Sequence, residues 1–232
     1  MEAVVKIGGS LAESPASLRV LCLELSELAD RKRFLVVPGG GGFADKVREY
    51  DESISLSSTI AHKLAILAMD QFGILLSDIT PNSETTYSLS TAKKLSKSGK
   101  VAIILPSKLV LREDSLEHSW DVTSDSIAAY IALKLHAEKL ILATNVDGVY
   151  SEDPKKNSKA ELLRRLPLRV ILGWDKRTCV DKALPKLLSK TWLNCYVVNG
   201  KYAKRIGDIL ENHETFCTQI THTTAAGAKS EV

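Results

Sequence analysis

The sequence predicts an α/β protein, a three-layer αβα sandwich around a mainly parallel central sheet. Short runs rich in β-branched and other apolar residues alternate along the chain with longer segments of helical period. This alternation is typical of a parallel sheet that helices cover on both faces. The first two runs each end in a glycine turn that leads into a helix, so one strand–turn–helix unit is used twice.

The first half of the chain supplies most of the predicted sheet. Continuous apolar runs predict buried strands, and apolar residues spaced three and four apart predict helices. Pro38 is expected to end the second strand. We expect strands at 3–7, 34–37 and 101–105 and helices at 18–28, 43–50, 55–76, 83–98 and 123–135, the 55–76 helix turning Ile60, Leu64, Leu67, Ala68, Phe72 and Leu75 inward.

The second half continues the pattern after a long irregular stretch. A strand is predicted at 139–143, and the turn-rich, lysine-rich stretch 145–159 follows it. Beyond it we expect a helix at 180–192, a strand at 195–198, a helix at 202–210 and a strand at 216–220. Residues 221–232 are small and polar without a period, which predicts a disordered tail.

Composition and charge disfavour several classes of protein. Apolar residues make up 44% and charged residues 25% of the chain, which is ordinary for a globular domain. The net charge of +3 is spread over interspersed acids and bases, so no nucleic-acid or membrane partner is expected. With no leader-like segment and no apolar run of membrane-spanning length, we expect a cytoplasmic protein. Four cysteines without CxxC spacing are interpreted as reduced core thiols: Cys22, Cys179, Cys195 and Cys217.

The first candidate site residues are Lys6, Gly8, Gly9 and Ser10, where the first strand ends. Two glycines let the backbone approach a ligand and turn its N–H groups toward a phosphate. Lys6 belongs to a strand that helices should cover on both faces, so its ammonium needs an anionic partner. A lysine at a strand edge, pointing to water beside an ordinary turn, is the structural alternative.

A run of four glycines, Gly39, Gly40, Gly41 and Gly42, separates the second strand from its helix. It places main-chain amides and a helix N-terminus at the carboxyl edge of the sheet, where anions bind. The run also fits a loose dinucleotide fingerprint, but no acidic residue ends a strand about 20 residues later. Because the chain also has no Walker-A loop, we favour a phosphate site of another kind.

Two further motifs lie at the start of a predicted helix and after a predicted strand. Asp125 stands with Thr123 and Ser124 at the start of the 123–135 helix. A carboxylate there is ordinarily a helix cap, so a cap and a functional carboxylate are both open. Residues 145–155 follow an apolar strand and by themselves indicate only a tight turn and a basic loop.

In this order along the chain, the four motifs resemble those of the amino-acid-kinase superfamily, over about residues 3–220. The resemblance implies ATP as the phosphate donor, Mg²⁺ bound through the phosphates and catalytic roles for Lys6 and Asp125, with Asp125 also a candidate metal ligand. It implies one domain over 1–220, with an acceptor-binding lobe over about 1–135 and a nucleotide-binding lobe over about 136–220. The phosphate- and ATP-binding places fall on Gly8, Gly9, Ser10, Gly39, Gly40, Gly41, Gly42, Thr144, Asp147, Gly148, Val149, Tyr150, Asp153, Pro154, Lys155 and Lys182, with Lys155 or Lys182 as the second cation.

Within the superfamily, the chain is more similar to the short archaeal branch of phosphate kinases of methanofuran biosynthesis. Stretches 42–48, 62–66, 105–108, 117–126 and 196–200 carry this similarity. It implies transfer of the γ-phosphoryl group of ATP onto a small phosphate monoester. A phosphate ester needs cations beyond those that serve ATP. The candidate acceptor-binding residues are Arg48, Lys63, Lys108, His118 and Trp120, each with a structural alternative on a wet helix face or in the core.

Other activities of the same fold remain open. An isopentenyl phosphate kinase would need a long apolar acceptor pocket, and the segment around Lys108, His118 and Trp120 is more polar than that. A uridylate kinase and a non-catalytic nucleotide-binding protein are further alternatives. An edge strand and apolar helices predict a homo-oligomer, a dimer or higher.

Overall fold

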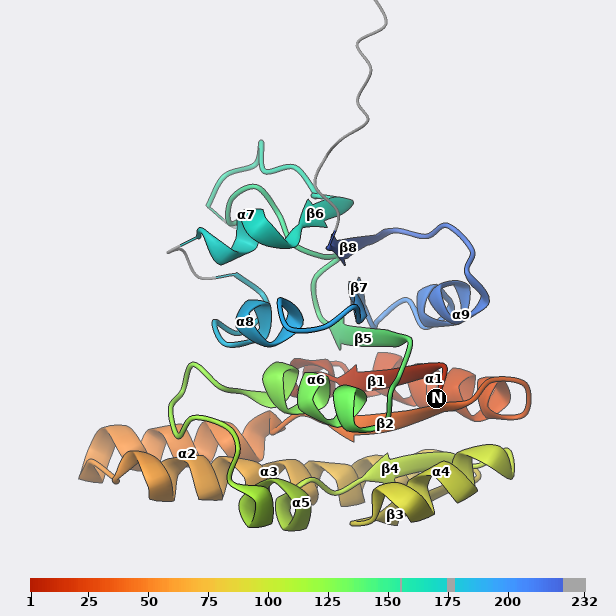
Figure 1. Cartoon of the computed structure of the whole chain (residues 1–232), viewed down its shortest axis with the longest axis horizontal. Coiled ribbons are helices and arrows are strands. Elements are labelled where there is room, and N and C mark those ends of the chain that lie inside the picture. Colours follow the sequence, from red (N-terminus) through yellow and green to blue (C-terminus); the bar gives the residue numbers. More distant parts are fainter. Residues whose placement is uncertain (155, 175–177, 223–232) are drawn as a thin grey trace, which may run out of the picture.

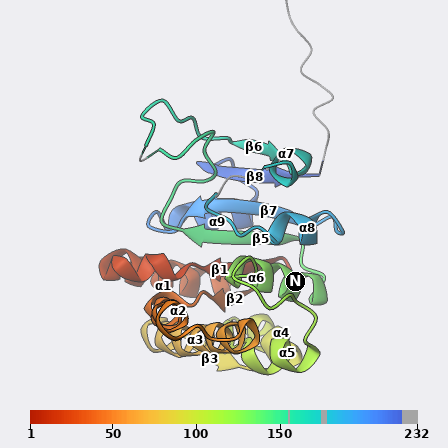
Figure 2. The ribbon, with the colours of Figure 1, turned by 90° about the vertical axis from the view of Figure 1, so that its left-hand side faces the viewer.

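The computed structural model describes residues 1–154, 156–174 and 178–222. Within these residues the strands form one eight-stranded sheet in the order β3-β4-β2-β1-β5-β7-β8-β6, and Figures 1 and 2 show them following one another up the molecule. Adjacent strands are parallel except β7 and β8. The bounds are β1 Ala3–Ile7, β2 Phe34–Pro38, β3 Ser83–Thr86, β4 Val101–Ile104, β5 Lys139–Thr144, β6 Arg165–Pro167, β7 Asn194–Asn199 and β8 Cys217–Thr221.

Helices cover both faces of this sheet. Successive residues of a strand point to opposite faces. Val4 of β1 therefore packs into a core lined by α6 and α8, whereas Val5 and Ile7 pack into a core lined by α1 and α9. The three-layer prediction is thereby confirmed. The helices are η1 Gly9–Glu13, α1 Pro15–Ala29, α2 Gly41–Ile54, α3 Ser58–Ile79, α4 Leu89–Lys97, α5 Ser107–Glu113, α6 Ser124–Lys134, α7 Leu168–Leu172, α8 Leu184–Leu188 and α9 Lys204–Glu211.

Two stretches differ from their predicted secondary structure. Residues 83–98, predicted as one helix, form the edge strand β3 followed by α4. Ser88 separates them, because its Oγ accepts a hydrogen bond of 3.3 Å from the Thr91 amide and so caps α4. The helix predicted at 180–192 is limited to α8. The sequence does not predict α5, α7 and β6, because elements of 7, 5 and 3 residues are too short to show a period.

The long helix α3 is apolar on two sides, and its predicted inward face is partly wrong. Phe72 is buried, but Ile60, Leu64, Leu67 and Leu75 are 37–44% exposed. By length and composition α3 could cross a membrane, contrary to the expectation that no such run exists, but 50% of that window is buried inside the fold. We therefore interpret α3 as a core helix that also presents an apolar outer face.

The sheet passes without interruption across the predicted lobe boundary. β1 pairs with β2 on one side and with β5 on the other. The division into acceptor-binding and nucleotide-binding lobes stays a prediction. Most of the expected tail, residues 223–232, lies outside the described residues.

Candidate active site

The two glycine turns lie side by side, because they follow the neighbouring parallel strands β1 and β2. A Cβ atom built on Gly9 would lie 2.2 Å from the Gly41 backbone, so no other residue fits at Gly9 without moving the chain. Gly41 has a φ angle of +55°, which also favours glycine. The turns therefore form one continuous main-chain surface at the carboxyl edge of the sheet.

The glycine amides divide into two groups. The Gly8 amide donates to the Ala143 carbonyl and the Gly39 amide donates to the Ile7 carbonyl, both at 2.8 Å. These two bonds join neighbouring strand ends and leave neither amide for a ligand. By contrast, the first amides of α2, from Gly41 onward, have no partner within the helix. Because these amides coincide with the positive end of the helix dipole, this is where the turns can bind an anion.

A buried ion pair lies next to the glycine turns. Lys6 Nζ is 2.7 Å from Asp125 Oδ1, and the two residues are only 8% and 5% exposed. Burial raises the pKa of the Asp125 carboxyl, Lys6 opposes that rise, and nearby Asp181 adds to it. Taking both charges out of water costs free energy that their attraction offsets. Lys6 is therefore held by a carboxylate inside the protein, which rules out a lysine at a strand edge in water.

Asp125 is not the cap of α6, because Asp181 has that role. The Oδ2 atom of Asp181 accepts hydrogen bonds of 2.9 Å from the amides of Thr123 and Ser126. Its Oδ1 atom accepts one of 2.8 Å from the Leu184 amide, which ties α8 to α6. Asp125 Oδ2 in turn accepts from the Asp181 amide at 3.2 Å. Asp125 is thus oriented toward Lys6 and is not needed to begin the helix.

A cleft of about 840 Å³ opens beside this ion pair. Residues of α2 line one side, residues of α7, α8 and the 178–182 segment line the other, and Asp125 lies between them. Figure 1 shows these elements on the left of the molecule, around the carboxyl ends of β1 and β2. Arg48, Lys182 and Lys186 add positive charge to the lining. The lining also contains the acidic residues Asp51, Glu52, Asp121, Asp125 and Asp181. The cleft is therefore mixed in charge and large enough for two small substrates.

Two predicted acceptor residues, Arg48 and Trp120, lie together in this cleft. The Arg48 guanidinium carbon is 4.8 Å from the centre of the Trp120 ring. The indole Nε1–H of Trp120 donates a 2.7 Å hydrogen bond to Asp51. A third, His118, stacks on His62, which lines two smaller cavities next to Trp120. Arg48 and Trp120 therefore make a polar and aromatic wall on the α2 side of the cleft, whereas His118 lines none of the three cavities and contacts them through His62.

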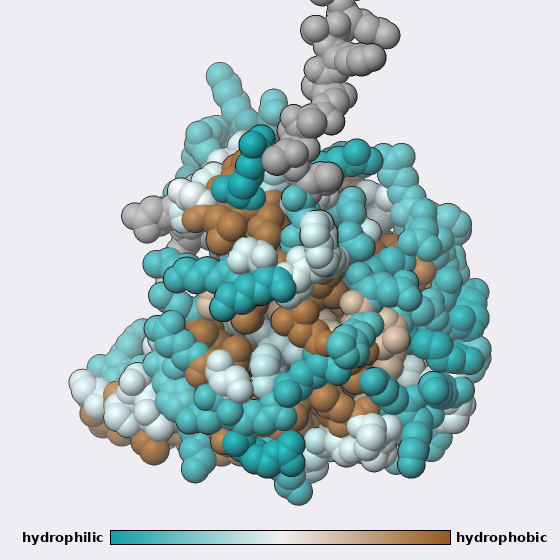
Figure 3. All heavy atoms as spheres, in the orientation of Figure 1, coloured by the Kyte–Doolittle hydropathy of each residue, from teal (hydrophilic) through white to brown (hydrophobic). Residues whose placement is uncertain are grey.

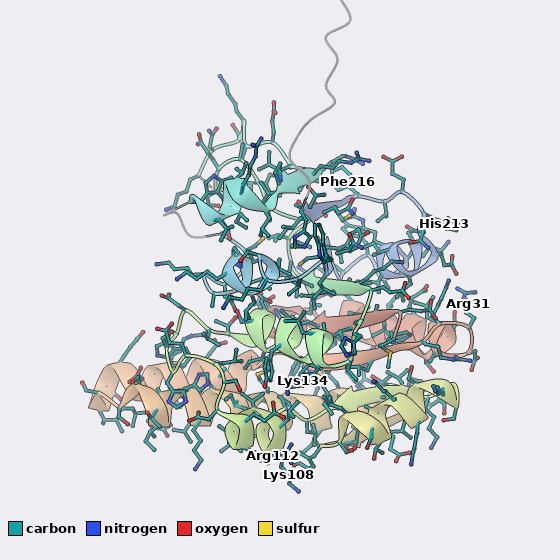
Figure 4. The ribbon with its side chains drawn as sticks, in the orientation of Figure 1. Arg31, Lys108, Arg112, Lys134, His213 and Phe216 are labelled. Carbon is teal, nitrogen blue, oxygen red and sulfur yellow. The ribbon has the colours of Figure 1, made fainter. Side chains whose placement is uncertain are left out.

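The structure does not bring Lys63 and Lys108 to this wall. Lys63 is exposed on α3, and Lys108 Nζ lies 4.2 Å from the centre of the Tyr87 ring. Figure 4 shows Lys108 pointing away from α5 at the foot of the molecule. Neither residue lines any of the three cavities described here. Both lysines fit the alternative of a solvent-exposed side chain on a helix surface.

The loop after β5 is tied to the sheet by its aspartate and glycine. Asp147 accepts hydrogen bonds from Arg205 at 2.5 Å and from Asn199 at 3.2 Å. Gly148 has a φ angle of +155°, and a Cβ atom there would lie 2.4 Å from Thr218 Oγ1. The Val149 amide donates to that same oxygen at 2.8 Å, and Val149 is buried. These contacts fix the shape of the loop. They do not test whether its side chains bind the nucleotide, so that role stays a prediction.

The remaining residues that were predicted to bind ATP differ from one another in burial and position. Thr144 is half-buried at the end of β5, and Ser10 is half-buried in η1, just after β1. Tyr150 forms an isolated bridge with Leu162, and Asp153 and Pro154 are exposed. Lys155 lies outside the described residues, whereas Lys182 lines the large cleft.

Sequence reasoning missed several residues of the cleft. Asp51, Asp181 and Lys186 line it, but each stands in an ordinary charged helical or loop segment with no motif around it. Cys179, expected in the core, is exposed and also lines the cleft. Cys22, Cys195 and Cys217 are buried free thiols, as expected.

Comparisons with known proteins identify the family of the chain. The model of the amino acid kinase family matches residues 1–184. A [5-(aminomethyl)furan-3-yl]methyl phosphate kinase from Methanocaldococcus jannaschii is 38% identical, with 94% of this chain and 96% of the relative covered. A uridylate kinase from Thermococcus kodakarensis is 27% identical, with 91% and 96% covered.

Solved structures show the same fold. Uridylate kinase from Archaeoglobus fulgidus superposes with a TM-score of 0.75 at 24% identity, with 95% of this chain and 100% of that chain covered. An isopentenyl phosphate kinase substrate complex superposes with a TM-score of 0.63 at 22% identity, with 94% and 99% covered.

The family match and the 38% identical relative show that this chain is a phosphotransferase. More particularly, the chain belongs to the amino acid kinase family.

Proposed function

We propose that this kinase transfers the γ-phosphoryl group of ATP to a small phosphate monoester, [5-(aminomethyl)furan-3-yl]methyl phosphate. The 38% identical relative is named for that acceptor and matches 94% of the chain. The observation that carries the proposal is the buried Lys6–Asp125 pair, 2.7 Å apart, beside two contacting glycine turns and a wide cleft. This arrangement suits the meeting of two phosphate groups.

The chemistry needs positioning and charge more than proton transfer. The second pKa of a phosphate ester is about 6, so the acceptor is largely a dianion at neutral pH and needs no general base. An acceptor oxygen forms a bond to the γ-phosphorus while the bond to the β,γ-bridging oxygen breaks, giving a diphosphate and ADP. Charge on the transferred group is spread over its equatorial oxygens. Lys6 and the first amides of α2 would stabilise it, and Asp125 would orient Lys6.

Magnesium fits this site as a companion of the nucleotide. Among the described residues, no group of three or more acidic, histidine or cysteine side chains is arranged to hold a metal ion. Mg²⁺ usually keeps several waters and binds through one or two carboxylates plus substrate phosphates. Asp125 is a candidate for such a carboxylate, because it lines the cleft next to Lys6. When bound, the ion would neutralise charge on the triphosphate.

Uridylate and isopentenyl phosphate remain the alternative acceptors. Uridylate kinases are among the relatives at 27% identity, and an isopentenyl phosphate kinase shares the fold. The acceptor wall of this chain carries Arg48, Asp51 and Trp120, which suits a polar, ring-bearing ester better than an isoprenoid chain. A non-catalytic nucleotide-binding protein would not need the buried Lys6–Asp125 pair.

A coupled assay of ADP release tests these alternatives side by side. The three acceptors are [5-(aminomethyl)furan-3-yl]methyl phosphate, isopentenyl phosphate and UMP, each with ATP and Mg²⁺. We expect the furan ester to have the highest kcat/KM. A higher value with UMP or isopentenyl phosphate would reassign the acceptor, and no release with any of them would favour a binding protein.

The proposal also covers the cellular location, the pathway and the oligomeric state of the enzyme. The 38% sequence identity with the relative from Methanocaldococcus jannaschii supports a cytoplasmic archaeal enzyme of methanofuran biosynthesis. The exposed apolar residues on the outer face of α3 support a homo-oligomer, a dimer or higher. Brown, apolar surface is visible at the lower left of Figure 3, where α2 and α3 lie. Sedimentation of the purified protein distinguishes a monomer from a dimer.

A further inference from the structure

Two small cavities meet at His62 and Trp120, on the α2 side of the large cleft. One, of about 50 Å³, opens beside Gly40 and Arg48. The other, of about 140 Å³, lies toward Asp51 and is lined by Ser119 as well. Trp120 lines both of them and the large cleft. The cavities therefore extend the acceptor side of the cleft behind the indole.

His62 is a buried polar side chain without a hydrogen-bond partner in the part of the chain that the structure describes. It is only 7% exposed and lines both cavities. Its ring stacks on His118, with ring centres 4.8 Å apart and an angle of 24° between the planes. The imidazole between the two cavities is therefore available to a ligand that enters either of them.

Neighbouring groups fix the orientation of this imidazole. His118 Nε2 is 2.7 Å from Asp114 Oδ1, and its Nδ1 is 3.2 Å from Thr59 Oγ1. Because both nitrogens of His118 have partners, its ring cannot turn without losing them, and the His62 ring stacked on it is held in turn. Preorganised groups of this kind bind with little loss of side-chain entropy.

The surroundings also keep His62 neutral. Burial lowers the pKa of His62, and His118 lowers it further, whereas Asp114 opposes them. A neutral imidazole has one N–H donor and one nitrogen lone pair. Among the residues that the structure describes, the nearby Ser119 Oγ is buried without a hydrogen-bond partner. Together with Asp51, these atoms make the cavities rich in acceptors.

We propose that His62 is a specificity-determining residue that accepts a hydrogen bond from an ammonium group on the acceptor, while Trp120 contacts the acceptor's ring. This rests on the proposed function, which assigns an amine-bearing furan phosphate as acceptor. Arg48 is placed for the phosphate end of such a molecule, and Asp51 supplies the negative charge that an ammonium needs. UMP and isopentenyl phosphate have no ammonium group, so the same contact disfavours both.

The test compares two acceptors that differ only in the amine. They are [5-(aminomethyl)furan-3-yl]methyl phosphate and furan-3-ylmethyl phosphate, assayed by ADP release. We expect His62→Leu to raise KM for the amine-bearing acceptor about 10- to 100-fold, the range for losing a hydrogen bond to a charged group. KM for the amine-free acceptor and both kcat values should change little. His62→Asn, which keeps an acceptor oxygen, should recover part of the loss.

The matched control is His213→Gln, because His213 is exposed and lies beyond α9, far from the cleft (Figure 4). It should leave both KM values unchanged. An unchanged ratio of the two KM values in His62→Leu and His62→Asn would overturn the role of His62 alone. If the unmodified enzyme turns over neither furan ester, the proposed function falls and this inference falls with it.

A pH series on the unmodified enzyme gives the same test without any variant. Protonating His62 replaces its lone pair with a second N–H and places a positive charge among His118, Asp114, Arg48 and Asp51. KM for the amine-bearing acceptor should therefore rise more steeply than KM for the amine-free acceptor as pH falls from 7 to 5. Loss of the second phosphate charge near pH 6 affects both acceptors equally. Parallel pH profiles would contradict the proposal.

Discussion

Lys6 and Lys139 are two equally buried lysines on neighbouring strands, each 8% exposed, yet they have different partners. Lys6 lies near the carboxyl end of β1, 2.7 Å from Asp125, which lines the cleft. Lys139 begins β5, and its Nζ donates to the carbonyls of Ile209 and Leu210 at 2.9 and 3.3 Å. Those carbonyls are the C-terminal end of α9.

The difference teaches that burial alone does not mark a functional lysine. Carbonyls at a helix C-terminus are satisfied by a cation and carry the negative end of the helix dipole. Lys139 therefore ties β5 to the end of α9 and lines none of the three cavities described above. A carboxylate at the wall of a cleft can share its cation with an incoming phosphate. The position of this partner is why we propose Lys6, and not Lys139, as the functional lysine.

Removing the Lys6 ammonium should give the largest effect. We expect Lys6→Ala to lower kcat about 100-fold or more, the scale of losing one group that stabilises transition-state charge. The fold should survive, because the raised pKa of Asp125 lets its carboxyl take up a proton once its partner is gone. Steady-state ADP release and a thermal melt measure the two effects. A kcat near that of the unmodified enzyme would remove Lys6 from the mechanism.

Asp125→Asn should reduce kcat by a similar order, because Lys6 then loses the charge that orients it. Stability should change less than in the matched variant Asp181→Ala, which removes the acceptor for the Thr123, Ser126 and Leu184 amides. We expect Asp181→Ala to cost about 2–4 kcal/mol of unfolding free energy. The reverse pattern in urea titrations, with Asp125→Asn the less stable protein, would restore Asp125 as a cap.

Lys139→Met should show the opposite behaviour from Lys6→Ala. Methionine keeps the length of the apolar stem but leaves the Ile209 and Leu210 carbonyls unpaired, at a cost of about 1–3 kcal/mol. The kcat should stay within about twofold, because Lys139 is at the amino end of its strand, away from the cleft. Chemical denaturation measures the unfolding free energy, and ADP release on the same sample measures kcat. Loss of turnover in a fully folded Lys139→Met protein would break the comparison.

The sequence best predicts those parts of the site that depend on residues close to one another along the chain. Lys6 and the glycine turns follow directly from two strands and the residues that end them, so their adjacency could be derived before any coordinates. The cap of α6 could not be, because Asp181 is more than 50 residues away from Thr123 and reaches it only through the packing of α8 on α6.

The long helix shows a second limit. The residues of α3 are apolar on two sides, so their period does not say which side meets the sheet, and four predicted core residues are exposed. His62 is one of the polar residues on its buried side. Histidines in such positions are usually structural, and the position between two cavities distinguishes this one.

The smallest expected effect is a pH dependence of stability from Lys139. Burial lowers its pKa from the ordinary 10.5, and Lys32 lowers it further. The folded protein then releases this proton at a lower pH than the unfolded chain does. Stability should therefore rise with pH between the two pKa values, the upper being 10.5. Lys139→Met should lack that rise in urea titrations at pH 8–10.5, and an identical rise would mean that Lys139 does not cause it.

The position of the terminal phosphate in the cleft tests the role of Lys6 most directly. A crystal structure with Mg²⁺ and a non-hydrolysable ATP analogue gives this position. The γ-phosphate should lie within hydrogen-bonding distance of Lys6 Nζ and of the first amides of α2. A triphosphate bound elsewhere in the cleft, with Lys6 still bound to Asp125 and beyond hydrogen-bonding distance of the γ-phosphate, would contradict the role of Lys6.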